Sequence, residues 1–157
     1  MASKVVLNRI EILKPLDVYE VEYKKKPVYV FENELLTRLY TNVGVYDWRV
    51  LPTYMSNCGS IPWIGQKILR VKSFDPDNDL QNIGFFFHDD GYQKRGYGIF
   101  ERDDVDAVCR GILREAGLSR FQASTIDLAL FLGAWGHWGD NCYDNFDYLS
   151  SLRKVAA

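Results

Sequence analysis

The first fifty residues alternate hydrophobic and polar side chains in short runs, which is the pattern of β-strands. Residues 18–23 alternate in this way, residues 24–27 form a charged turn of three lysines and a proline, and residues 28–31 form an apolar run. This order predicts an antiparallel hairpin with one face in water. A further strand is expected over residues 45–51, where Pro52 ends it.

Residues 53–79 are rich in Gly, Pro, Ser, Asn and Asp, a composition that predicts a long loop. Long loops in compact domains often carry function. The acidic run over residues 75–79 lacks the bend glycine and the closing glutamate of an EF-hand, so it does not predict a calcium loop. Capping of the next helix by Asp77 or Asp79 is the favoured interpretation.

Three helices are predicted after this loop, over residues 80–94, over the residues between Asp103 and Gly117, and over residues 119–138. The second is expected to begin at Asp103 as its N-cap, with Asp106 in the capping-box position, and to end at Gly117. The third is almost continuously apolar, so we expect it to be the buried central helix.

These elements predict an α+β fold, with antiparallel strands and a hairpin followed by a three-helix core. At 157 residues the chain is within the size range of a single domain. Residues 1–52 form its strand-rich part, residues 53–79 the loop and residues 80–138 the helical core. Residues 139–157 form an aromatic and then basic tail that is expected to pack on the core or on another subunit.

Composition and charge restrict the partners of the chain. A net charge of −2 gives no field that would attract phosphate backbones, so nucleic acid is not expected as a partner. The three cysteines have no C-x-x-C spacing, which predicts reduced thiols rather than a zinc site or disulfide framework. No signal-peptide core and no membrane span are recognised, so we expect synthesis and folding in a cytoplasm.

Candidate chemistry is concentrated on the helix predicted over residues 80–94. His88 and Tyr92 are four residues apart and share one face, whereas Asp89 lies about 100° round the helix from His88. The second helix can bring Asp106 to one nitrogen of His88, which would leave the other nitrogen free to accept a proton from water. His88 would then be a general base, and Asp89 could bind a cation that stabilises an oxyanion.

The same residues allow other interpretations. A buried His-Asp-Tyr network that only holds two helices together stays open. His137 is interpreted as a packed or capping residue, because no metal-ligand spacing accompanies it. A metal-dependent HD phosphohydrolase needs histidines before its His-Asp pair, and none precedes His88. Pairing of Cys58 with His88 has no supporting motif.

Several motifs together resemble a phage and prophage protein family of unknown function. They are the Asn57-Cys58-Gly59-Ser60-Ile61-Pro62 loop, then His88-Asp89-x-x-Tyr92, then Arg102-x-x-x-Asp106 with a stop at Gly117, and the match covers residues 45–138. The resemblance implies a virion-associated component, for example of a tail or baseplate, found in the virion or the host cytoplasm. Its partners would be other virion proteins or further copies of the chain.

The same His88-Asp89-x-x-Tyr92 motif, followed by a distant aspartate, is similar to the catalytic helices of calcium-dependent phospholipase A2 enzymes. By this likeness His88 activates water, Asp106 steadies His88, Tyr92 completes the catalytic set and Asp89 binds Ca²⁺. The loop that contains Gly59 would stand in for the calcium loop of those enzymes. The likeness implies a second hypothesis, a calcium-dependent hydrolase of envelope lipid or a related ester or amide, with transient envelope contact during entry or lysis.

Overall fold

The computed structural model describes residues 5–59, 61, 63–133 and 136–156. Within these residues an N-terminal group of strands is followed by helices and a last strand, which confirms the predicted α+β class. The strands are β1 (Leu7–Lys14), β2 (Val18–Tyr23), β3 (Lys26–Phe31), β4 (Leu35–Thr41), β5 (Gly44–Val50), β6 (Met55–Ser56) and β7 (Ser150–Lys154). The helices are α1 (Trp63–Leu69), α2 (Asp79–Gln93), α3 (Arg102–Glu115) and α4 (Arg120–Gly133), with short 3₁₀ helices η1 (Arg95–Gly98) and η2 (Asp147–Leu149).

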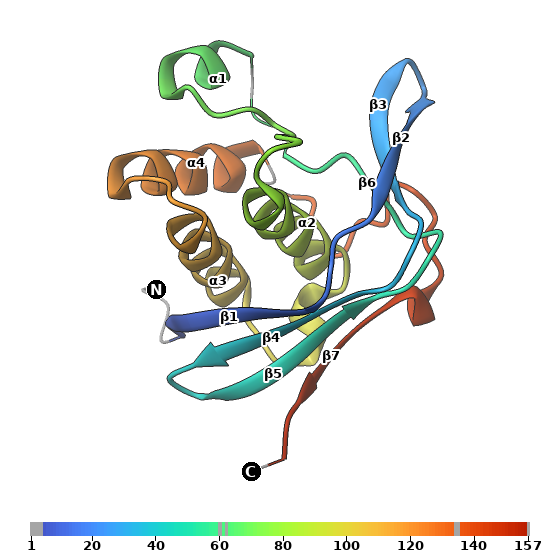
Figure 1. Cartoon of the computed structure of the whole chain (residues 1–157), viewed down its shortest axis with the longest axis vertical. Helices are drawn as coiled ribbons and strands as arrows, with labels where there is room; N and C mark the ends of the chain where they lie inside the picture. The colour runs from blue at the N-terminus through green and yellow to red at the C-terminus, as the bar shows by residue number, and fades with distance from the viewer. Residues whose placement is uncertain (1–4, 60, 62, 134–135, 157) are drawn as a thin grey trace.

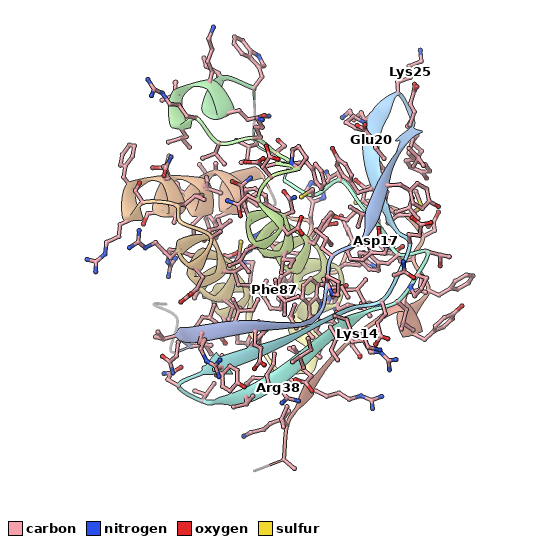
Figure 2. The ribbon with its side chains drawn as sticks, viewed as in Figure 1. Lys14, Asp17, Glu20, Lys25, Arg38 and Phe87 are labelled. Atoms are coloured by element: carbon pink, nitrogen blue, oxygen red, sulfur yellow. The ribbon has the colours of Figure 1, made fainter. Side chains whose placement is uncertain are left out.

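The main sheet is antiparallel and has the strand order β1-β4-β5-β7. Strand β4 alternates strictly between buried and half-buried positions, because a strand turns successive side chains to opposite faces. Helices α2 and α3 cover one face of this sheet (Figure 1). Between them lies the core, which contains Phe87 (Figure 2). The rings of Trp48 and Phe87 meet there edge to face, with their centroids 5.2 Å apart.

Strands β2, β3 and β6 form a smaller sheet, and β2 with β3 forms the predicted hairpin. Tyr23 is opposite Lys26, so only Lys24 and Lys25 make the turn, whereas a turn over residues 24–27 was expected. Both lysines have positive φ, 50° and 64°, which matches the tight two-residue turns that fit strand twist. Lys25 lies at the tip of the hairpin, which extends away from the helices (Figure 2).

The chain between residues 53 and 79 is not one loop as predicted. It contains the two-residue strand β6 and the helix α1, whose buried residue is Leu69. Trp63 and Ile68 on α1 are 73% and 72% exposed. Because most of α1 is not covered by the rest of the chain, no clear periodic pattern marks it in the sequence.

The C-terminal tail completes the main sheet. Strand β7 pairs with β5 and places Leu152 opposite Trp48 (Figure 1). The tail had been expected to pack on the core or on another subunit, without a strand of its own. Its short sequence, Ser-Ser-Leu-Arg-Lys, has a single large apolar side chain, so alternation alone could not reveal it.

Helix α4 is not the buried central helix that its composition predicted. It ends at Gly133 rather than at residue 138, and residues 134–135 of the predicted range lie outside the described residues. Phe121, Leu128 and Leu132 on its outer face are exposed, while Ile126 faces the core. The central helix is α2, because α4 packs at the outer side of α3 (Figure 1).

The first turns of α2 and α3 are capped by residues other than those predicted. The side chain of Asn78, rather than Asp77 or Asp79, caps α2 by accepting from the Gln81 N–H at 3.1 Å. Helix α3 has Glu101 as its N-cap, and the Glu101 N–H donates to Asp104 at 3.0 Å, so Asp103 and Asp106 do not form the capping box.

This shift of the capping box matters for the site, because Asp106 lies inside α3 and its carboxylate is not used by the helix end. Gly117 has a φ of +98° and follows the last turn of α3, which confirms the predicted stop.

Asp90 joins α2 to the main sheet through a fully buried carboxylate. It accepts from Trp48 Nε1 at 2.7 Å, from Ser150 Oγ at 2.7 Å and from the Tyr97 hydroxyl. These donors come from β5, β7 and η1. Burial raises the pKa of Asp90 to about 6, against the opposing effect of the hydrogen bonds from Ser150 and Trp48.

Replacement of Asp90 by Asn should therefore change how stability depends on pH. A carboxyl whose pKa is higher in the folded chain than its ordinary value of 3.8 favours folding at low pH, and this contribution is lost as pH rises through about 6. We expect the unfolding free energy of the wild type, relative to Asp90→Asn, to fall by about 3 kcal/mol between about pH 4 and pH 7. Urea unfolding at several pH values measures this difference, and a constant difference would contradict it.

Candidate active site

His88, Tyr92 and Asp106 form a hydrogen-bonded cluster between α2 and α3. His88 Nε2 lies 2.9 Å from Asp106 Oδ1, and the Tyr92 hydroxyl donates to the same oxygen at 2.8 Å. All three side chains are buried. The contact between His88 and Asp106 that the sequence predicted is therefore present.

Close packing of α2 on α3 places this cluster. A Cβ added at Gly91 would lie 2.6 Å from Val105 Cγ1, and one added at Gly84 would lie 3.1 Å from Leu113 Cδ2. Both glycines are on α2, and the side chains that they contact are on α3. The absence of side chains at these positions lets the helices approach closely enough for Asp106, next to Val105, to reach His88.

The cluster sets the orientation of the imidazole. A carboxylate only accepts hydrogen bonds, so in the neutral ring the proton is on Nε2 and Nδ1 is the acceptor. The ring of Tyr92 stacks on that of His88 with a centroid distance of 4.2 Å, which holds the ring plane. Burial, followed by the negative charge of Asp106, raises the pKa of Tyr92, so its hydroxyl remains a donor.

A cavity of about 470 Å³ opens beside the cluster. Its wall is built by α2, Lys26 of β3, the segment after β6, α4 and the segment over residues 137–143. His88 lines it, and Nδ1 has no hydrogen-bond partner among the described residues. A small molecule in the cavity can therefore contact His88.

Asp89 lies beside His88 in the same cavity wall. Burial raises the pKa of Asp89, whereas a hydrogen bond with Ser56 and the charge of His88 lower it. Its Oδ2 atom is buried and has no hydrogen-bond partner in the described part of the chain. This oxygen is therefore an acceptor atom that the described residues leave unused, although the carboxylate also bonds Ser56.

Gly59 is not in the wall of the cavity that contains Asp89. It lines a neighbouring cavity, and a Cβ there would lie 3.0 Å from the ring of Phe85 and 3.1 Å from Ser73 O. Packing against these two residues explains the glycine without a metal. Asp89 and Gly59 therefore line two neighbouring cavities.

Calcium binding requires six to eight oxygen ligands, commonly several carboxylates. Across the described residues, no three His, Cys, Asp or Glu side chains are grouped so that they could hold a metal ion. Asp89 Oδ2 supplies one oxygen. The described side chains do not form a calcium site on their own, and Ca²⁺ binding stays a prediction.

Sequence reasoning did not identify Gln93 as a site residue. It lies four residues after Asp89 on α2, lines the same cavity, and its Nε2 atom is buried without a hydrogen-bond partner among the described residues. The helical spacing from Asp89 is a signal that could have indicated it.

Two further residues with possible chemistry, His137 and Cys58, line the cavity. His137 follows α4 in an exposed turn and pairs with Asp140 at 3.0 Å, rather than being packed. Cys58 is buried, its Sγ donates to the Asn82 carbonyl, and burial raises the pKa of the thiol. A thiol of this kind is a poor nucleophile.

Comparisons of the chain with protein-family models, with curated proteins and with solved structures found no match. The resemblances to a phage protein family and to phospholipase A2 enzymes consequently rest on the motifs themselves. The functions that they imply remain proposals.

The shared acceptor predicts non-additive effects of substitutions in the cluster. Tyr92→Phe removes one donor and should lower the unfolding free energy by about 1 kcal/mol. Asp106→Ala leaves two buried donors without an acceptor and should cost about 3 kcal/mol. In the Asp106→Ala background, Tyr92→Phe should instead raise the unfolding free energy by about 1 kcal/mol, because it removes one of the two donors left without an acceptor. Urea denaturation of the four proteins measures this cycle, and simple additivity would show that the two side chains do not share the bond.

Proposed function

We propose that the protein is a hydrolase in which His88 activates a water molecule. The observation that carries the proposal is the geometry of one imidazole. Asp106 binds Nε2 at 2.9 Å, and His88 lines a cavity large enough for a small ligand. A base that is oriented by a carboxylate and can reach a bound substrate is the arrangement that general base catalysis requires.

The expected reaction begins with water held at Nδ1 of His88. The imidazole accepts a proton from this water while the oxygen attacks the carbonyl carbon of an ester or amide in the cavity. Asp106 stabilises the imidazolium that forms, through the hydrogen bond to Nε2. The imidazolium then returns the proton to the leaving group. Tyr92 acts as a positioning residue, because it contacts Asp106 and the imidazole face.

Substitution of His88 tests this proposal. His88→Gln keeps a donor that can reach Asp106 but removes the base, so hydrolysis of a panel of fluorogenic esters and amides should fall at least about 100-fold. The thermal unfolding of the variant should stay close to that of the wild type.

The second histidine of the chain, His137, is the alternative candidate for the base, and His137→Gln tests it. His137 also pairs with a carboxylate, but the pair is exposed to solvent. We expect a loss below about tenfold for this variant, because an exposed pair is not held in one orientation. If His137→Gln abolished turnover and His88→Gln did not, the base would be misassigned.

A second candidate function is that of a virion-associated component, in the virion or in the host cytoplasm. Exposed apolar side chains favour it, because large uncovered apolar surfaces commonly mark interfaces. Phe146 and Tyr148 stack at 5.6 Å and are both exposed, and Phe121 and Leu132 on α4 are exposed as well. The partners would be other virion proteins or a second copy of the chain. None of the described helices combines the length and apolar character needed to cross a bilayer, so any envelope contact would be transient.

Purification of phage particles from infected cells tests the virion candidate. The chain should copurify with particles through a density gradient, and Phe146→Ser with Tyr148→Ser should release it without lowering its thermal stability. Lys24→Ser with Lys25→Ser, at the exposed hairpin tip, is the control pair. Recovery of the chain only as a free monomer would contradict this candidate.

A further inference from the structure

We infer that the cavity beside His88 binds a secondary amide, with the amide N–H on Asp89 and its carbonyl on Gln93. This inference rests on the proposed function, since the amide would be the substrate of the hydrolase. The proposed function leaves open whether the substrate is an ester or an amide. The inference specifies a secondary amide, and it assigns Gln93 a catalytic role.

Two unpaired atoms define this subsite. Among the described residues, Asp89 Oδ2 and Gln93 Nε2 are the buried side-chain polar atoms that lack a hydrogen-bond partner. Four residues along a helix correspond to a rise of about 6 Å on one face, and both side chains line the same cavity. A buried polar group without a partner is costly, so two of them together indicate that a ligand supplies the partners.

The orientation of the Gln93 amide is determined by its surroundings. Asn145 Oδ1 accepts from the Met55 N–H at 2.9 Å, and Asn145 Nδ2 donates to the Met55 carbonyl at 3.0 Å. With Asn145 held in this way, its Nδ2 also donates to Gln93 Oε1 at 3.3 Å, and the Tyr54 hydroxyl donates to that oxygen at 3.4 Å. The acceptor end of Gln93 is thus occupied, and the donor end is left for the cavity.

Asp89 Oδ2, an acceptor, and Gln93 Nε2, a donor, together complement the two polar groups of an amide. Ser56 hydrogen-bonds to the Asp89 carboxylate, which leaves Oδ2 as an acceptor, and Gln93 presents a donor. A secondary amide offers one N–H and one carbonyl, which satisfy both atoms. An ester offers the carbonyl alone and would leave Asp89 Oδ2 buried without a partner, a difference that sites of this kind use to reject substrates.

The same contacts support a balanced hydrolysis. His88 accepts a proton from water, the water oxygen bonds to the carbonyl carbon, and the carbonyl oxygen becomes an oxyanion that accepts from Gln93 Nε2. The C–N bond then breaks, and the nitrogen receives the proton from His88. The products are a carboxylic acid and an amine, and water is the only co-reactant. Asp89 orients the N–H of the bond that is cleaved.

Binding of two matched probes tests the inference. N-benzylacetamide and benzyl acetate differ in the replacement of N–H by oxygen. Their binding is measured in the His88→Gln protein, which retains the subsite but lacks the base, by following the Gln93 side-chain signals in ¹H–¹⁵N NMR spectra. We expect N-benzylacetamide to shift the Gln93 signals saturably and to bind at least about tenfold more tightly than benzyl acetate.

Gln93→Glu replaces the donor by an acceptor while an oxygen remains for Asn145 and Tyr54. It should lower the affinity for N-benzylacetamide about tenfold. Gln122→Glu changes the charge of the chain equally at a glutamine on α4 that bonds to the Leu69 carbonyl, and it should leave the affinity within about twofold. If Gln93→Glu does not fold, the comparison of the two probes decides the question alone.

Equal affinity for the two probes, or no saturable shift with either, would overturn the amide inference. So would displacement of the amide by calcium chloride with shifts at Asp89, which would support the calcium prediction instead. These outcomes are separate from the failure of the proposed function, because the His88→Gln protein needs no turnover. Conversely, His88-dependent cleavage of esters without amide selectivity would support the proposed hydrolase and contradict only the amide inference.

Discussion

Helix α2 is buried along most of its length, and the polar side chains on it must find partners inside the protein. Asn82 satisfies this requirement by exchanging two hydrogen bonds with the backbone of Asp75, at 2.7 and 2.9 Å. Asp90 satisfies it through β5, β7 and η1, and His88 through Asp106 on α3. Because each partner lies on a different element, the polar groups of α2 specify how loop, sheet and α3 are placed around it.

Asp89 and Asp90 are adjacent on α2, but one borders the cavity and the other is part of the core. They point about 100° apart. Asp90 receives hydrogen bonds from three side chains and forms part of the core. Asp89 Oδ2 receives none from the described residues and borders the cavity. A buried unpaired group costs about 1–3 kcal/mol, so the difference between these adjacent residues indicates where a ligand is expected.

The sequence predicted the parts of the site that depend on local spacing. His88 and Tyr92 share a face because they are four residues apart, and the apolar run before His88 indicated that a partner from another element was needed. Asp106 on the next helix was the predicted partner of His88. The capping box was misplaced because the run from Glu101 to Asp106 offers several acidic residues for it, and only the packing of α3 against α2 selects Asp104.

Other features depend on contacts between distant parts of the chain and could not be predicted. The free donor of Gln93 is set by Asn145, which is 52 residues away, and by Tyr54. Strand β7 is identified by its pairing with β5 rather than by its own composition. The hydrophobicity of α4 extends around the helix, so the sequence could not show that Phe121 and Leu128 would be exposed while Ile126 is buried.

A purely structural His-Asp-Tyr network and a catalytic one would share the same three contacts, and the surroundings distinguish them. Protein interiors are packed densely, and a network that serves only to join two helices needs no space beside it. Here His88 lines a cavity of about 470 Å³, and the wall also contains Asp89 and Gln93, each with a buried polar atom that lacks a partner among the described residues. A base beside an unpaired acceptor and an unpaired donor in one cavity wall is better suited to bind and transform a polar molecule than to hold two helices together.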